Sequence, residues 1–390
     1  MERSFISRNP SVLVFLAILA LFTLGVTVLS EGFGVGVIST SFVKTLGKTL
    51  CLCLIAVAMD LIWGYAGILS LGHFAFFGLG GYMVGMWLMY ERTRQIVENS
   101  LSDGVLPPTP EEIEAAIGNQ IFGVVGSSEF PLIWNFADSF VLQMAFVVLI
   151  PGLLALVFGW LAFRSRVTGV YLSILTQAMT LGLSLYLFQN ASGLRGNNGL
   201  SGLQNLPGVT APQSMVSLWF FWASALALAL GYLLVAWAVS GKFGSVIRGI
   251  RDNEARVRFL GYSVELYKLA VFTLTACIAG IAGALYYPQA GIINPAEVAP
   301  IASIYLAVWV AIGGRGRLYG AVIGTGFVSL VSSWFTGGQA PDVNLGFYTI
   351  KWVDWWLILL GLSFVLVTLY APKGMGGLID LISRKKGSET

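Results

Sequence analysis

The chain has 390 residues, of which 56% are hydrophobic and only 11% are charged, and its mean hydropathy is +0.80. This composition excludes an ordinary soluble globular domain and indicates a protein whose helices lie in a lipid bilayer. The formal net charge of +3 is small. The placement of Lys and Arg along the chain is therefore more informative than their excess, because it sets the orientation of membrane helices.

Apolar segments follow one another along almost the whole chain. A membrane-spanning helix needs about 20 predominantly apolar residues. Polar stretches divide the sequence into ten such segments, at approximately 11–30, 41–63, 67–90, 134–163, 168–189, 217–239, 268–288, 299–313, 318–336 and 353–370. The first resembles a signal peptide without a small-residue cleavage site, so we expect a retained span. The eighth is short and ends at Gly313 and Gly314, which indicates a broken or re-entrant helix.

These segments predict an all-α polytopic membrane protein with about ten transmembrane helices in a single domain, residues 1–390. Its orientation follows from the basic residues. With a cytoplasmic N-terminus, the inside segments hold Arg3, Arg8, Arg164, Arg166, Lys242, Arg248, Arg251, Arg256, Arg258, Lys268, Arg315, Arg317, Lys373, Arg384, Lys385 and Lys386. The outside keeps only Lys44, Lys48, Arg92, Arg94, Arg195 and Lys351. Because cytoplasmic loops are enriched in Lys and Arg, we expect both termini in the cytoplasm.

Three stretches outside the spans carry most of the remaining polar sequence. Residues 91–133 form an expected periplasmic excursion, in which Thr109 and the acidic Glu111 and Glu112 predict the start of a short helix. Residues 240–267 form a strongly charged cytoplasmic loop, and residues 373–390 form a cytoplasmic tail.

The third segment carries a concentration of glycine between Gly64 and Gly85, which reads GYAGILSLGHFAFFGLGGYMVG. Glycines in a membrane helix either allow neighbouring helices to approach closely or mark an unwound stretch whose free backbone groups bind a solute. Both interpretations stay open for this segment. His73, the only histidine of the chain, and Ser70 lie within it.

A polar side chain inside a span costs free energy and tends to face the protein interior or a cavity. The candidates for a substrate path on this ground are Ser70, His73, Thr176, Gln177, Asn197 and Asn198. The plainer interpretation is hydrogen bonding between helices, above all for Gln177. His73 has no Asp, Glu or Cys nearby, so no metal site is expected, and Glu297 and Asp354, near predicted outer ends, are weaker candidates.

The cytoplasmic loop predicts an amphipathic helix, since apolar residues interleave with charged ones between Val246 and Leu260. Such a helix either lies on anionic lipid or docks a protein partner. Asp252 and Glu254 would weaken lipid binding, and they favour a protein partner.

The same loop contains the run Arg251, Asp252, Asn253, Glu254 and Ala255, followed by Gly261. This run resembles the E-A-A coupling loop of ABC importer permeases, with the glycine one position later than in the general pattern and a single Ala after the Glu. The resemblance implies that these residues, together with Arg248, couple the chain to an ATPase. The resemblance extends over almost the whole chain, through WGYAG at 63–67, SLGH at 70–73, IGGRG at 312–316 and APKG at 371–374. It is to the branched-chain amino acid and urea group of these permeases. The runs at 151–178 and RGNNGLSG at 195–202 look like the second permease of urea importers.

This resemblance implies a transport subunit of the bacterial inner membrane and not an enzyme. Its expected partners are a homologous second permease, two cytosolic ATPase subunits, a periplasmic solute-binding protein and the lipid bilayer, with no nucleic acid. The expected cargo is urea or a short amide, and the alternative within the family is a branched-chain amino acid. The chain holds no G-x-x-x-x-G-K-[ST] loop, so no cofactor of its own is expected and ATP would bind to the partner subunits.

Two rival functions lie outside that family. A passive channel or a secondary transporter would need no coupling loop, and a proton-driven one would normally carry ionisable groups at mid-membrane, where this chain offers little beyond Asp60. An intramembrane enzyme using His73 as a base lacks an H-E-x-x-H motif, paired carboxylates or a Ser-His arrangement.

Overall fold

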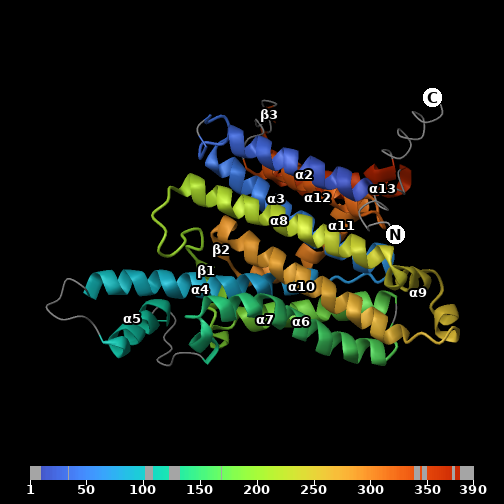
Figure 1. The fold of residues 1–390 in the computed structure, drawn as a ribbon, viewed down its shortest axis with the longest axis horizontal. Coiled ribbons are helices and arrows are strands. Elements are labelled where there is room, and N and C mark those ends of the chain that lie inside the picture. The colour runs from blue at the N-terminus through green and yellow to red at the C-terminus, as the bar shows by residue number, and fades with distance from the viewer. Residues whose placement is uncertain are drawn as a thin grey trace, which may run out of the picture.

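The computed structural model describes residues 10–33, 35–101, 109–122, 132–167, 169–337, 343–344, 349–370 and 374–377. Its α-helices are α2 (Pro10–Leu29), α3 (Thr40–Asp60), α4 (His73–Leu101), α5 (Pro110–Phe122), α6 (Phe140–Arg164), α7 (Val170–Phe188), α8 (Gln213–Ser240), α9 (Lys242–Phe259), α10 (Val264–Ala290), α11 (Pro300–Gly313), α12 (Leu318–Thr336) and α13 (Trp352–Tyr370). Most of the long helices run roughly along one axis (Figure 1). We call the end that carries α9 the α9 end, and the end that carries α5 the far end.

Short elements connect these helices. They are the π-helix η1 (Leu61–Tyr65), the 3-10 turns η2 (Leu132–Phe136), η3 (Asn190–Ser192), η4 (Gly196–Asn198) and η5 (Pro295–Val298), and the antiparallel strand pairs β1 (Leu200–Ser201) with β2 (Ile292–Ile293) and β3 (Val343–Asn344) with β4 (Thr349–Ile350).

Each of the ten predicted segments contains a helix, and the prediction of an all-α polytopic membrane protein is confirmed. Within the described residues, seven helices are long and apolar enough to cross a membrane, namely those at 10–29, 40–65, 140–164, 170–188, 213–240, 264–290 and 318–336. The eighth predicted segment corresponds to α11, which at 14 residues is too short for a full span. This agrees with the expected re-entrant helix.

The excursion after the third segment begins later than its composition indicated. α4 continues to Leu101, because Arg94 bonds Glu98 at 2.8 Å and lies 3.7 Å from Glu91 on the same helix face. α5 begins where the capping signal predicted, with the Thr109 backbone N–H donating to Glu112 at 2.9 Å. That hydrogen bond lowers the pKa of the exposed Glu112 carboxyl.

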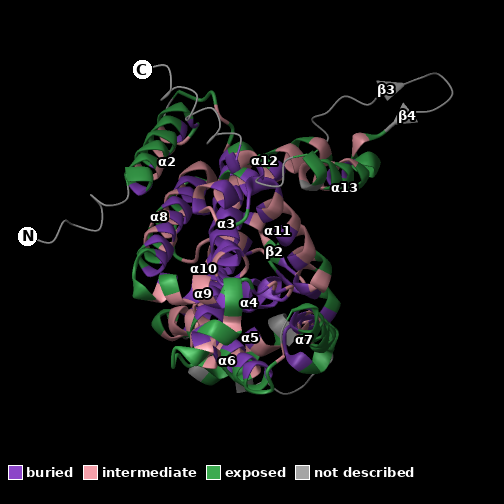
Figure 2. Ribbon diagram, turned by 90° about the vertical axis from the view of Figure 1, so that its right-hand side faces the viewer, coloured by how far each residue is buried: buried purple, intermediate pink, exposed green. Residues whose placement is uncertain are grey.

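The interior of the bundle is built around α3 and α10. α3 is buried along nearly its whole length, whereas α2 buries only Val12, Leu19 and Val26, one narrow stripe against α8. Figure 2 shows this contrast, with buried residues along α3 and exposed ones on the outer side of α2. A helix that is apolar all round but exposed is typical of contact with lipid.

Glycines permit the close contact of α4 and α10. A Cβ atom on Gly80 would collide with the Gly280 carbonyl, and one on Gly283 would collide with the Phe77 carbonyl. Close packing through small residues, one of the two interpretations of the glycine cluster, therefore holds for Gly80.

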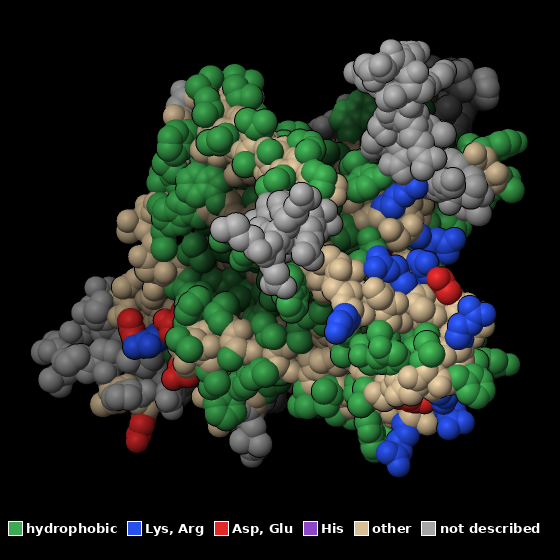
Figure 3. Space-filling model, turned by 45° about the vertical axis from the view of Figure 1, so that its right-hand side comes forward, with side chains coloured by type: hydrophobic (Ala, Val, Ile, Leu, Met, Phe, Trp, Pro, Cys, Tyr) green, Lys and Arg blue, Asp and Glu red, His purple; other side chains and the backbone are tan. Residues whose placement is uncertain are grey.

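The two ends of the molecule differ in the charge of their side chains. Figure 3 shows Lys and Arg side chains gathered toward the α9 end, while acidic side chains prevail at the far end in the same view. α2 begins at the α9 end, and α10 leaves it toward the far end (Figure 1).

Candidate functional site

The first element of the site is a break between α3 and α4. Helical structure stops at the end of η1, and residues 66–72 are not helical before α4 begins at His73. Gly67 has φ +74°, a left-handed conformation that glycine adopts at little cost. The second interpretation of the glycine cluster, an unwound stretch, therefore describes this part of it.

α7 satisfies the backbone of the broken stretch. The Ser173 hydroxyl donates to the Leu69 carbonyl at 2.7 Å, and the Leu71 N–H donates to the Thr176 hydroxyl at 3.0 Å. Irregular backbone at membrane depth requires such partners, because no water is present to replace them. Thr176, predicted as a path residue, thus supports the break directly, and Ser173 does so without having stood out in the sequence.

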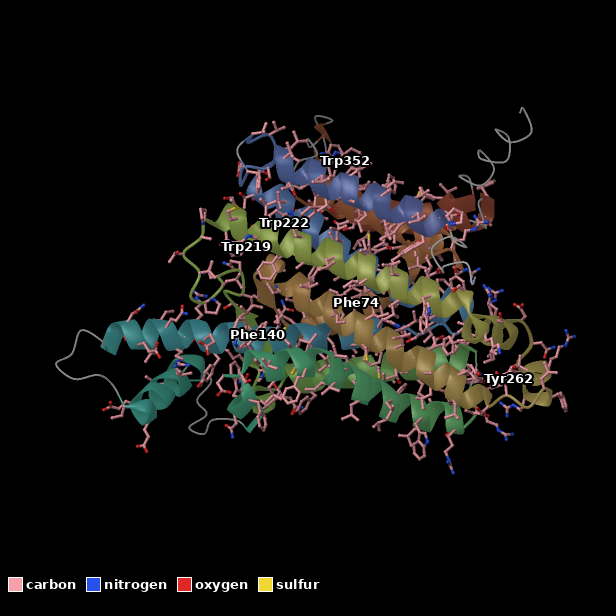
Figure 4. The ribbon with its side chains drawn as sticks, in the orientation of Figure 1. Phe74, Phe140, Trp219, Trp222, Tyr262 and Trp352 are labelled. Carbon is pink, nitrogen blue, oxygen red and sulfur yellow. The ribbon has the colours of Figure 1, made fainter. Side chains whose placement is uncertain are left out.

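The N-terminal turn of α11 packs beside that of α4. The Phe74 N–H donates to the Ser303 hydroxyl at 3.1 Å, and Val298 of η5 packs against Gly78. Phe74 lies near the middle of the long axis of the bundle (Figure 4). From there α4 runs to the far end, whereas α11 ends at Gly313, toward the α9 end (Figure 1).

Two discontinuous helices therefore begin near the middle of the bundle and run in opposite directions. Each helix N-terminus carries a partial positive charge, although Phe74 and Ala75 of α4 and Ala302 of α11 already donate their N–H groups, and Pro300 has none. Discontinuous helices that meet at mid-membrane form the solute sites of several transporter folds, where the positive helix ends point at anionic groups of the solute.

Ser70 and His73 are fully buried next to these helix starts. The Ser70 hydroxyl and both ring nitrogens of His73 have no hydrogen-bond partner among the described residues, although the Ser70 carbonyl lies close to the ring. The His73 ring is edge-on to Phe76 and Phe272, with centroids 6.0 and 6.5 Å apart. Buried polar groups are normally paired, so unpaired ones here have capacity left for a solute or water.

The other predicted path residues lie apart from this group. Gln177 is half-buried on α7, one residue after Thr176. Asn197 and Asn198 are exposed in η4, between α7 and the β1–β2 pair. The structure thus brings Ser70, His73 and Thr176 together and leaves the two asparagines at the surface.

Glu297 is one of the weaker candidates from the sequence, and the structure half-buries it. It lies half-buried in η5, in the segment that leads from α10 back to the start of α11. Its carboxylate interacts with Lys48 of α3 and approaches the Tyr287 hydroxyl without meeting hydrogen-bond geometry. The dipeptide Asn294–Pro295 before it was the available signal for a re-entrant turn.

The charged loop forms α9, which is kinked and not continuous as the amphipathic pattern predicted. Asn253 has φ −160° and ψ 95°, outside the helical range. Its side-chain oxygen accepts from the Arg256 N–H at 3.0 Å and so caps a second short helix. Gly261, with φ +86°, follows the end of that helix.

Beyond the kink, the end of α9 and the turn after it present an apolar surface that we call the docking tip: Phe259, Leu260 and Tyr262. Phe259 is 91% exposed and Leu260 71% exposed, and Tyr262 lies at the extreme of the α9 end (Figure 4). Large apolar side chains this exposed indicate a protein contact or a membrane contact.

An ion-pair cluster attaches the docking tip to α10. Glu254 accepts hydrogen bonds from Arg258 at 2.9 Å and from Lys268 at 2.6 Å, and Arg258 also bonds Glu265 at 2.9 Å. The Lys268 side chain is only 9% exposed, which strengthens its attraction to Glu254. Glu254 is thus engaged within the chain.

Arg251 connects α9 to the break. Its guanidinium donates to the Gly64 carbonyl at 2.8 Å, and its aliphatic part packs on Gly67. Close by, the Gly316 N–H donates to the Asp60 carboxylate at 2.7 Å, which ties the loop between α11 and α12 to the end of α3. One junction therefore joins α9, the broken stretch and the segment that follows α11.

Comparison with known proteins adds the family. A profile for the permease component of the branched-chain amino acid transport system matches residues 41–368. The chain is 25% identical over 250 residues to the high-affinity branched-chain amino acid transport system permease protein LivM of Escherichia coli K12, an alignment that covers 58% of this chain and 56% of LivM. LivM of Salmonella typhimurium LT2 is 24% identical over 232 residues, covering 54% and 51%.

A second group of relatives matches a shorter region. The autoinducer 2 import system permease protein LsrC of Escherichia coli O9:H4 is 30% identical over 117 residues, which is 27% of this chain and 34% of LsrC. These alignments span about half or less of the length of the curated relatives. No solved structure matches the chain.

Proposed function

Because this multi-pass membrane protein belongs to the permease component family of branched-chain amino acid transport systems, we propose that it is one permease subunit of an ATP-driven importer whose cargo is urea or a short amide. The observation that carries the proposal is the pair of discontinuous helices, α4 and α11, whose N-terminal turns lie side by side and are linked through residues 64–72 to the surface helix α9. A homologous second permease, two ATPase subunits and a periplasmic solute-binding protein would complete the importer.

A neutral amide suits the chemistry around the helix starts. Urea has one carbonyl oxygen, which accepts hydrogen bonds, and two NH2 groups, which donate them. The partial positive charge of the helix N-termini would attract the oxygen, while the Ser70 hydroxyl and a His73 ring nitrogen would accept from the NH2 groups. The resemblance of residues 151–178 and 195–202 to urea importers supports the same cargo.

The ATPase subunits would bind at the α9 end. Its excess of Lys and Arg supports a cytoplasmic location (Figure 3), and the docking tip offers them Phe259 and Leu260. A partner that displaces α9 would act through Arg251 on residues 64–67, and so on the start of α4. Helix movements of this kind interconvert discrete states of a transporter.

A branched-chain amino acid is the second candidate cargo, and the identity with LivM favours it. Lys48 of α3 and Glu297 of η5 are a basic and an acidic side chain that interact, and η5 leads to the start of α11. Opposite charges of this kind complement the carboxylate and ammonium groups of an amino acid.

The test is uptake of labelled urea by cells that lack the chain and by the same cells with it restored, with leucine and isoleucine as competitors. Loss of urea uptake that the amino acids do not compete supports the urea cargo. Unchanged urea uptake together with lost leucine uptake supports the amino acid cargo and refutes urea.

A further inference from the structure

A pocket of about 260 Å³ lies at the α9 end, between the start of α2, the end of α8, α9 and the start of α12. Its polar lining includes Arg248 of α9, Arg317 just before α12 and Tyr65 of η1. Val12 and Val239 belong to its apolar wall. Segments far apart in the sequence thus build an amphipathic pocket that is separate from the helix starts at mid-depth and from the docking tip.

The pocket is positively charged. Its described lining residues include two arginines and no Asp or Glu, and no ion pair involves Arg248 in the part of the chain that the structure describes. The nearby Asp60 carboxylate accepts from the backbone N–H groups of Gly316 and Arg317, and among side chains it interacts with Arg251 and Arg315. A guanidinium carries donors in a planar fork that matches the oxygen atoms of a phosphate.

The surroundings of the pocket are apolar and face outward. α2 contributes Val12 to the pocket, and beyond its buried stripe it exposes large side chains such as Leu13, Val14 and Ile18. An acyl chain that followed this flank of α2 would remain in hydrocarbon while its head group stayed beside the arginines. Basic pockets between the ends of transmembrane helices bind anionic lipid head groups in this arrangement.

We infer that this pocket binds the phosphate head group of an anionic membrane phospholipid, such as phosphatidylglycerol. The two guanidinium groups bind the phosphodiester oxygens, and the Tyr65 and Tyr319 side chains border the head group. A soluble phosphate compound would share the guanidinium contacts and would have no use for the apolar wall.

The site bears on the coupling junction. Arg248 lies three residues before Arg251, so the two are neighbours on one face of α9. A lipid held by Arg248 and Arg317 would fix α9 against the start of α12. Lipid binding in this pocket does not depend on the identity of the cargo, and it can be tested without transport.

The experiment uses the full-length chain, purified in mild detergent with whatever subunits accompany it. After delipidation, native mass spectrometry measures retention of added phosphatidylglycerol by the natural protein and by the double variant Arg248→Gln/Arg317→Gln. Each charged hydrogen bond lost should weaken binding by about tenfold. The matched control is Arg164→Gln/Arg166→Gln, which removes two arginines from another pocket of the same end.

We expect loss of phosphatidylglycerol only in the Arg248/Arg317 variant, with folding verified by size-exclusion chromatography and by recovery of binding in Arg248→Lys/Arg317→Lys. Equal retention of phosphatidylcholine would overturn the inference, since no anionic recognition would then exist. Displacement of the lipid by millimolar inorganic phosphate would also overturn it, in favour of a soluble anion. Equal loss of phosphatidylglycerol from the Arg164→Gln/Arg166→Gln variant would overturn the inference as well, because binding would then depend only on the overall positive charge of the α9 end.

Discussion

The Arg251 guanidinium donates a 2.8 Å hydrogen bond to the Gly64 carbonyl, across 187 positions of the chain. This bond joins the surface helix α9 to the stretch that breaks the membrane helix before His73. Its location is the reason to expect that a force applied at α9 reaches the start of α4.

Replacing Arg251 with Gln should uncouple ATP hydrolysis from uptake. Loss of the charged hydrogen bond to Gly64, in a half-exposed setting, costs about 1–2 kcal/mol, so the uptake per ATP hydrolysed should fall about tenfold. The measurement is the ratio of solute taken up to phosphate released by the reconstituted complex. Arg256→Gln is the control, because Arg256 is an exposed arginine of the same helix; an equal fall in both variants would contradict the specific role of Arg251.

Glu254→Lys should abolish uptake and leave the protein in the membrane. The new ammonium would lie beside Arg258 and the nearly buried Lys268, both of which now bond Glu254, and like charges would push the docking tip away from α10. Immunoblots of membranes measure insertion, and labelled solute measures uptake. Glu254→Gln, which keeps a hydrogen-bond acceptor, should retain part of the activity; normal transport by the lysine variant would refute the docking role of α9.

Thr176→Val should destabilise the break. It removes the acceptor of the part-buried Leu71 N–H and leaves that group without a partner, at a cost of about 1–3 kcal/mol. A lowered melting temperature in detergent is the expected result, and Thr176→Ser should restore it. Thr180→Val is the control, because the Thr180 hydroxyl bonds only the Thr176 carbonyl of its own helix in the described structure; similar destabilisation by both would remove the special role of Thr176.

Glu297→Gln should raise the KM for the solute several-fold while uptake at saturation changes little. The reason is that a half-buried carboxylate on the way to the helix starts binds N–H groups of the solute more strongly than an amide does. Initial uptake rates over a range of solute concentrations measure it. Asp354→Asn is the control, since Asp354 is the other acidic residue that the sequence placed near an outer end. An unchanged KM in the Glu297→Gln variant would show that Glu297 does not bind the solute.

The helices of this protein could be predicted because a span needs a long apolar run, and such runs are visible without any tertiary contact. The end of α4 was placed too early, because the charged residues after Tyr90 read as a loop while Arg94 and Glu98 in fact pair along a continuing helix. Hydropathy indicates whether a segment lies in lipid or in water. It does not indicate whether a polar segment outside the membrane is helical.

The site was less predictable, because its defining contacts join distant residues. The glycines between Gly64 and Gly85 suggested both close packing and an unwound stretch, and only the contacts of Leu71 with Thr176 and of Gly80 with Gly280 assign each role to its own part. The kink at Asn253 was hidden by an amphipathic pattern that runs through it. The half-buried position of Glu297 could not be predicted, because a carboxylate near an apolar segment reads as a surface group, whereas the chain here turns back into the bundle.

The measurement that tests the central claim most directly is the initial rate of labelled urea uptake by proteoliposomes that contain the reconstituted complex, with and without ATP at the ATPase subunits. The account predicts uptake against a urea gradient that stops when ATP is absent and falls sharply when Phe259 of the docking tip is replaced by Asp. Uptake that continues without ATP until the inside and outside concentrations are equal would contradict it, and would identify the chain as a passive path.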